Sequence, residues 1–148
     1  MRKKSLKEAI IVDLDGTLAN VDHRLHHLQS QTKDWAAFFA AMGEDKPQAW
    51  CAFITQHLPV EVILMSGRPG EYEEETKQWL QVNQIKYDRL IMRARGDFRK
   101  DDIVKKELYE RDVKGKYEVL FVIDDRKQVV DMWRSIGLVC LQCAPGDF

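Results

Sequence analysis

Short apolar runs alternate along the chain with longer amphipathic segments. The first run, residues 9–12, is rich in β-branched residues and indicates a buried strand. Because strands that alternate with helices form parallel sheets, the pattern predicts an α/β fold with a Rossmann-like parallel sheet covered by helices on both faces. We predict strands at 9–12, 60–65, 87–92, 119–123 and 138–141, and helices at 71–80, 101–109 and 128–134.

Residues 19–59 separate the first two predicted strands, and we interpret them as a small helical insertion. Asp34 is expected to cap a helix over 36–41, and Pro47 to stand in the first turn of a second helix that ends near His57. The aromatic residues of this segment have helical spacing, which favours covering the sheet over lining a substrate entrance. They are Trp35, Phe38, Phe39, Trp50 and Phe53. We expect residues 1–148 to form a single domain.

Charge is balanced over the whole chain but not locally. The 148 residues carry a formal net charge of −1, so any contact with nucleic acid would have to be local. Residues 86–100 include six basic side chains against only Asp88 and Asp97. Such a run could follow a phosphate backbone or could be an ordinary solvated surface, and the pattern leaves both interpretations open.

The sequence indicates a soluble protein in a reducing, cytoplasmic setting. The basic residues 1–4 precede an apolar run that is too short for a signal peptide or a membrane span. Three cysteines are few and odd in number, which argues against a disulfide framework. Cys140 and Cys143 would lie on opposite faces of a strand, so we interpret them as structural thiols.

Acidic residues follow the first and fourth predicted strands. In Asp13-Leu14-Asp15-Gly16-Thr17 the two acids are two positions apart and would share one face of an extended strand. Two neighbouring carboxylates repel each other, which predicts a bound cation or a shared proton. An acidic turn would explain Asp-Gly alone, but the five-residue string after an apolar strand favours chemistry.

Further polar residues follow the other strands. Ser66-Gly67-Arg68 comes after the second strand and Asp124-Asp125 after the fourth. Ligands of parallel sheets bind beyond the carboxyl ends of the strands, where all these residues should meet. Lys105 and Lys106 compete for a cationic role, and we choose Lys105 because Asp101 lies one helical turn before it.

Asp-Leu-Asp-Gly-Thr resembles the first motif of the haloacid dehalogenase superfamily of phosphotransferases, and the serine, the lysine and the Asp124-Asp125 pair match its later motifs. The resemblance implies that Asp13 is a nucleophile and Asp15 a general acid/base, with Lys105 as the third catalytic residue. It also implies a magnesium ion. The expected metal ligands are Asp13, Asp15, Asp124 and Asp125.

A closer resemblance is to the phosphatase module of the phage polynucleotide kinase 3'-phosphatase family. It covers nearly the whole chain and is strongest after Arg99, in Arg-Lys-Asp-Asp-Ile-Val-Lys and Ile-Asp-Asp-Arg-x-Gln-Val-Val. It implies a magnesium-dependent phosphatase that removes 3'-phosphates from single-stranded or nicked DNA or RNA through an aspartyl-phosphate. The implied substrate contacts are Thr17, Arg24, Ser66, Gly67, Arg68 and Asp101.

Two other functions remain open at this point. A mononucleotidase acting on 5'- or 3'-mononucleotides would use the same core, and a non-catalytic module that binds nucleic-acid ends would keep only the fold. The chain has no Gly-rich loop ending in Gly-Lys-Ser/Thr, so we expect no 5'-kinase activity from it and a separate kinase or ligase partner.

Overall fold

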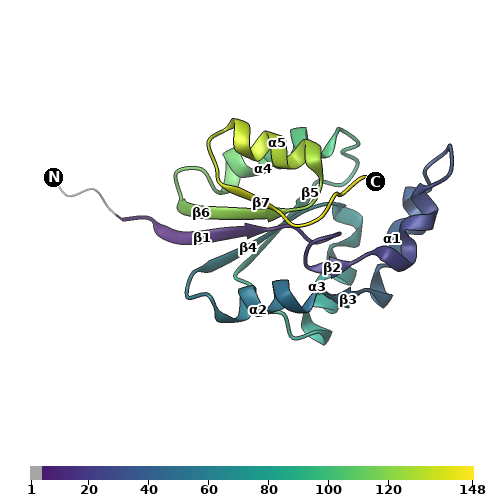
Figure 1. Cartoon of the computed structure of the whole chain (residues 1–148), viewed down its shortest axis with the longest axis horizontal. Helices are drawn as coiled ribbons and strands as arrows, with labels where there is room; N and C mark the ends of the chain where they lie inside the picture. The colour runs from purple at the N-terminus through teal and green to yellow at the C-terminus, as the bar shows by residue number, and fades with distance from the viewer. Residues whose placement is uncertain (1–4) are drawn as a thin grey trace.

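A computed structural model describes residues 5–148, and the basic residues 1–4 lie outside the described residues. Five strands form a parallel sheet in the order β5-β4-β1-β6-β7, which confirms the predicted α/β class (Figure 1). The central strand is therefore the one that precedes the Asp-x-Asp turn. The strands are β1 (Lys7–Val12), β4 (Glu61–Pro69), β5 (Arg89–Arg93), β6 (Tyr117–Asp124) and β7 (Cys140–Gln142).

Helices cover both faces of the sheet, with α4 (Asp101–Asp112) and α5 (Lys127–Ser135) on one side and α2 (Ala49–His57) and α3 (Glu73–Val82) on the other (Figure 1). Ile11 packs toward the α4 and α5 side, whereas its neighbour Ile10 packs toward α2 and α3. Alternate residues of a strand point to opposite faces, so a strand covered twice must be apolar throughout. This explains the uninterrupted apolar run at 9–12.

The insertion contains more than the two predicted helices. Asp34 caps α1 (Trp35–Ala40) as predicted, since its side chain accepts a hydrogen bond of 3.0 Å from the backbone nitrogen of Ala37. The prediction for Pro47 is wrong: it lies in β3 (Lys46–Pro47), opposite Ala19 of β2 (Ala19–Asn20), and α2 begins after it. A short edge strand tolerates proline because it needs few ladder hydrogen bonds. The remaining turns are the 3-10 helices η1 (Asp22–Leu28), η2 (Met42–Glu44) and η3 (Gly70–Tyr72).

The aromatic residues of the insertion do not cover the sheet, which corrects the prediction. Phe38 is buried in a separate small cluster with Val21 and Leu28. Trp50 and Phe53 of α2 remain 44% and 64% exposed. Helical spacing placed these rings on common faces, but it could not tell which neighbour each face would meet.

Cys140 and Cys143 are free thiols on opposite faces of the sheet, as their spacing predicted. Burial raises the pKa of Cys140 to about 12 and that of Cys143 to about 11, so both are protonated at neutral pH. Within residues 5–148, none of the helices has the length and apolar character needed to cross a membrane.

Candidate active site

The turn after β1 brings two strand ends together. The backbone nitrogen of Asp13 donates to the carbonyl oxygen of Ile123 in β6 at 3.0 Å, so Asp13 begins at the meeting point of the two strands. Gly16 has a positive φ of 83°, and a Cβ atom there would lie 2.1 Å from a carboxylate oxygen of Asp125. The position therefore requires glycine, which lets the turn approach the Asp125 side chain.

Three buried carboxylates form what we call the acidic cluster, namely Asp13, Asp124 and Asp125. Each offers one oxygen, and these oxygens lie within 4.8 Å of one another. Lys105 Nζ donates to Asp13 Oδ1 at 2.8 Å and to Asp124 Oδ2 at 2.9 Å. The hydroxyl of Thr17 lies 3.2 Å from Asp13 Oδ2 and 3.4 Å from Asp125 Oδ1. The buried ammonium group of Lys105 and the buried hydroxyl group of Thr17 therefore both contact the acidic cluster.

The acidic cluster holds more negative charge than Lys105 balances. Burial, together with the neighbouring Asp124, raises the pKa of Asp13 well above its ordinary value and that of Asp125 to about 6. Burial alone would lower the pKa of Lys105, but Asp124 and Asp13 raise it well above its ordinary value. Three carboxylates around one ammonium leave an excess of negative charge, and hard oxygen ligands suit Mg²⁺. The residues present therefore fit a divalent cation.

A second buried group, which we call the arginine clamp, consists of Arg24, Arg68 and Asp45 around Asp15. The guanidinium groups of Arg24 and Arg68 each donate to Asp15 Oδ1 at 2.6 Å. Arg24 also donates to both carboxylate oxygens of Asp45, at 2.8 and 2.6 Å. Burial opposes ionisation of Asp15, but Arg68 and Arg24 lower its pKa to about 2. Asp15 is therefore a carboxylate at neutral pH in the free protein.

The clamp bears on one predicted role, which stays a prediction. The side chain of Asp15 was expected among the metal ligands, but in the described part of the chain the acids that converge are Asp13, Asp124 and Asp125. Arginines hold the Asp15 carboxylate instead, because Arg24 and Arg68 enter from the insertion and from the end of β4.

Asp45 is the residue that sequence reasoning missed. It is buried in the insertion, where it accepts from Arg24 and lies 2.6 Å from Nε2 of His23. Its backbone carbonyl accepts from the indole nitrogen of Trp79 at 2.9 Å, which ties the insertion to α3. Pairing of β2 with β3 brings residues 24 and 45 into contact across 21 positions, and no local pattern in the sequence signals that contact.

The last residues of β4 line the opening to both buried groups. Ser66 is buried, and its hydroxyl accepts from the backbone nitrogen of Arg68 at 3.0 Å. A Cβ atom at Gly67 would lie 1.8 Å from Asp101 Oδ1, so the chain passes directly against that carboxylate. Asp101 lies 3.3 Å from Arg93 and 3.9 Å from Lys105. Lys106, one position further along α4, is exposed, in line with the choice of Lys105.

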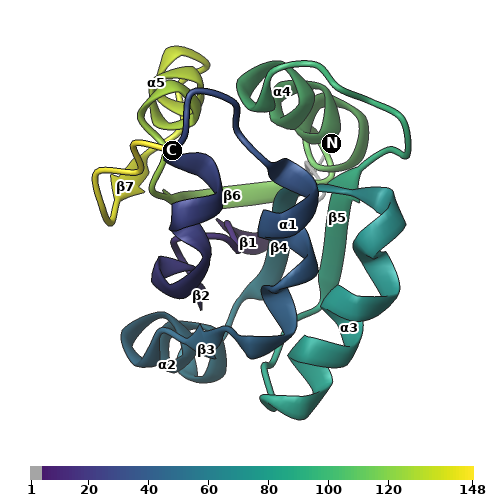
Figure 2. The same ribbon diagram turned by 90° about the vertical axis from the view of Figure 1, so that its right-hand side faces the viewer.

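One cavity of about 540 Å³ lies at the carboxyl ends of the strands, and most of the predicted site residues line it. Figure 2 looks onto this edge, where α1 lies across the ends of β1 and β4. Thr17, Arg24, Lys105 and Asp124 lie buried behind its surface. The predicted site residues that line the cavity are Asp13, Asp15, Ser66, Gly67, Arg68, Asp101 and Asp125.

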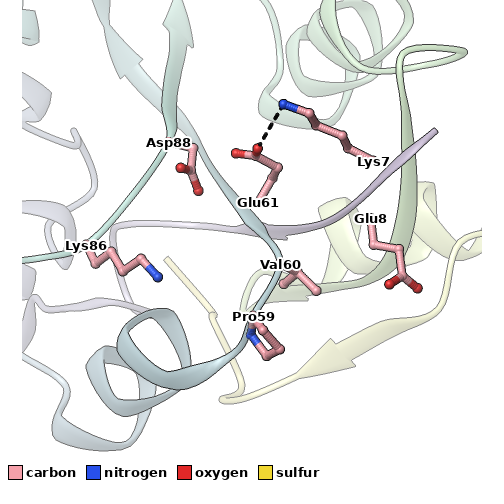
Figure 3. Close-up of a pocket in the computed structure, with 7 residues that line it drawn as sticks. All are labelled: Lys7, Glu8, Pro59, Val60, Glu61, Lys86 and Asp88. Carbon is pink, nitrogen blue, oxygen red and sulfur yellow. Dashed lines mark ion pairs between the residues drawn. The ribbon is translucent and has the colours of Figure 1, made fainter. Parts of the chain in front are cut away.

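The basic run at 86–100 is divided between the two edges of the sheet. Lys86 lines a separate hollow at the amino ends of β1 and β4, next to the ion pair of Lys7 with Glu61 (Figure 3). Arg93, Arg99 and Lys100 line the large cavity at the opposite edge. The run crosses the sheet along β5, so it does not form one continuous basic surface.

The chain has the fold of the haloacid dehalogenase superfamily. The HAD domain of the effector protein Lem4 from Legionella pneumophila aligns with 97% of this chain and 90% of its own, at a TM-score of 0.56 and 18% identity. Within that superfamily the chain belongs to the family of polynucleotide kinase PNKP phosphatase domains, because the sequence model of that family matches residues 7–148.

Two relatives support this assignment. A chain in the structure of the Pnkp1/Rnl/Hen1 RNA repair complex is 39% identical, with a TM-score of 0.83, and covers 100% of this chain. A protein of Autographa californica nuclear polyhedrosis virus, named as a bifunctional polynucleotide kinase/RNA ligase, is 30% identical over 135 residues, or 88% of this chain. The chain spans 46% of the first relative and 18% of the second.

Proposed function

We propose that the protein is a magnesium-dependent phosphatase that removes 3'-phosphates from DNA or RNA ends through an aspartyl-phosphate. The observation that carries this proposal is that Asp13, paired with Lys105, and Asp15, held by two arginines, open into the same cavity. Membership of the PNKP phosphatase domain family supports the substrate class.

In the first step a carboxylate oxygen of Asp13 attacks the phosphorus atom. The bond between phosphorus and the 3'-oxygen of the nucleotide breaks, and the leaving oxygen takes a proton from Asp15. Lys105 and Ser66 provide positive charge and a hydroxyl group next to the transferred phosphoryl group. The products are a free 3'-hydroxyl and a phosphorylated Asp13.

Asp15 can donate that proton only after its surroundings change. In the free protein Arg24 and Arg68 keep it ionised, with a pKa of about 2. A bound phosphate attracts the same guanidinium groups, because arginine binds phosphate in the same two-pronged way as carboxylate. Transfer of the arginines from Asp15 to the phosphate raises the pKa of Asp15 and readies it as an acid.

In the second step Asp15 takes a proton from a water molecule that attacks the phosphorus atom of the aspartyl-phosphate. Inorganic phosphate leaves and Asp13 is regenerated. Asp13, Asp124 and Asp125 would hold the magnesium ion, which when bound supplies positive charge that offsets the charge of the phosphoryl group.

The relatives also support a setting for the reaction. One takes its name from kinase and ligase activities and another belongs to an RNA repair complex. We therefore propose that a kinase and a ligase act on the same ends, since a ligase requires the 3'-hydroxyl that this reaction makes. Three free thiols suit a cytoplasmic location.

The decisive experiment measures phosphate release from a 3'-phosphorylated oligonucleotide, with and without Mg²⁺, next to a 5'-phosphorylated oligonucleotide and 3'- and 5'-mononucleotides. We expect metal-dependent release from the 3'-phosphorylated end alone. Release only from mononucleotides would assign the protein to nucleotide metabolism, and oligonucleotide binding without turnover would make it an end-binding module. A rise in melting temperature with Mg²⁺ that Asp124→Asn removes would test the metal site independently of turnover.

A further inference from the structure

Part of the wall of the large cavity is aromatic. Trp35 and Phe39 of α1 stack with ring centroids 5.9 Å apart and an angle of 25° between the rings. Tyr72 continues the row, 5.3 Å from Phe39. All three residues line the cavity that contains Asp13 and Asp15. We call Trp35, Phe39 and Tyr72 the aromatic wall.

The aromatic wall is held in place from behind. The ring of Phe38 is buried and meets Trp35 edge-on at 5.7 Å and Phe39 at 5.4 Å. The guanidinium group of Arg24 lies over the Phe38 ring, 4.1 Å from the ring centroid. Rings fixed by one another lose little freedom when a further ring stacks on them, so the wall is prepared for a flat ligand.

Phe98 lines the same cavity from the loop between β5 and α4 and is 90% exposed. A phenylalanine ring that remains in water forgoes the favourable free energy of burying its apolar surface. An exposed ring at the edge of a cavity with a second aromatic surface is the arrangement that stacks nucleic-acid bases in single-strand binding proteins.

Positive charge borders this aromatic surface. The Arg126 guanidinium lies 5.9 Å from the centroid of Trp35 and 5.6 Å from that of Phe148. Lys100, two positions after Phe98 in the chain, also lines the cavity and is exposed. A base that stacks on the wall would therefore place the preceding phosphodiester near a cation.

We propose that the aromatic wall and Phe98 stack the terminal base of an unpaired, single-stranded 3'-phosphorylated end. This inference rests on the proposed function and specifies its substrate. A cavity of about 540 Å³ is of the size that takes one small ligand. A paired terminal base exposes only its outer face, whereas an unpaired base can offer both of its faces to the aromatic wall and to Phe98. The preferred substrate is therefore a frayed or unpaired end.

The test compares two 3'-phosphorylated single strands of identical sequence, one ending in thymine and the other in an abasic residue. For the wild-type protein we expect kcat/KM to be roughly tenfold higher with the terminal base, the size of effect that one stacked base typically has. Trp35→Ala and Phe98→Ala should each remove most of this preference while leaving the abasic substrate nearly unchanged. Trp35→Phe should restore part of the preference.

Phe53→Ala is the matched control, because Phe53 is an exposed ring of the insertion that does not line this cavity and packs on His57. It should retain the full preference for the terminal base. For the wild-type protein, kcat/KM should be lower with a blunt 3'-phosphorylated duplex than with the single strand. Trp35→Ala should make this difference in kcat/KM smaller.

The outcomes separate the two proposals. A wild-type protein that dephosphorylates both strands at equal rates overturns the stacking inference and leaves the proposed function intact. Equal losses on both substrates in Trp35→Ala and Phe98→Ala would reduce the wall to a structural role. No release from any 3'-phosphorylated strand would overturn the proposed function itself.

Discussion

The acidic cluster and the arginine clamp surround two aspartates that are only two residues apart, yet their electrostatics are opposite. Asp13 shares its surroundings with two further carboxylates, and burial with that repulsion raises its pKa. Asp15 lies between two arginines, which lower its pKa to about 2. The turn between them therefore separates the negatively charged acidic cluster from the positively charged guanidinium groups of the clamp.

The proposed roles require the reverse of this arrangement. A nucleophile should be ionised and a general acid should be protonated. A cation in the acidic cluster would favour ionised Asp13, and a phosphate that draws the arginines away would favour protonated Asp15. The charges of the free protein therefore favour binding of a cation and a phosphate, and these two ligands would bring Asp13 and Asp15 to the protonation states that the reaction requires.

Asp13→Asn should have the largest effect. The amide has the shape of the carboxylate but is a poor nucleophile, so we expect turnover to fall by at least about a thousandfold. Phosphate release from the 3'-phosphorylated oligonucleotide measures the loss, and circular dichroism checks that the fold remains. Turnover near the wild-type rate would refute the covalent mechanism.

Asp15→Asn should lower turnover of the oligonucleotide by about 10²- to 10⁴-fold, because its leaving group is an alkoxide that needs a proton. The loss should be much smaller with p-nitrophenyl phosphate, whose phenolate leaves without help. Steady-state kinetics on both substrates provide the comparison. If the two losses are equal, Asp15 is not the general acid.

Asp45→Asn probes the far side of the clamp. The amide keeps the shape but loses the charge that orients Arg24, so we expect kcat/KM to fall by roughly tenfold, mostly through a higher KM. Asp22→Asn is the control, since Asp22 is an exposed acid of the same insertion. An unchanged KM in Asp45→Asn would show that Arg24 needs no such support.

The pH dependence of stability should show the smallest effect. The folded pKa of Asp15 lies below its ordinary value of 3.8, so its stabilising contribution is complete above about pH 4 and is lost as the pH falls toward 2. At pH 6 the wild type should exceed Asp15→Asn by about 2 kcal/mol in unfolding free energy, and the gap should narrow by pH 3. Urea unfolding of both proteins measures this, and a constant gap would contradict the low pKa.

The sheet and much of the site could be predicted because the relevant signals are local. The run at 9–12 is apolar on both faces, and Asp101 lies one helical turn before Lys105, so short patterns were sufficient. The strand pair β2-β3 and the contact of Arg24 with Asp45 depend on how the insertion folds back on itself. The same is true of the aromatic rings, whose neighbours only the tertiary structure specifies.

The insertion has a consequence for anyone who would redesign this protein. Trp35 and Phe39, which we expect to select the substrate, share one short stretch of chain with Arg24, which lowers the pKa of Asp15, and with Asp45, which holds Arg24. Grafting a foreign loop in place of residues 19–59 to change specificity would also remove Arg24 and Asp45, two of the three residues of the clamp. The residues for substrate specificity and those for reactivity thus lie in the same segment, and a successful graft must supply both sets.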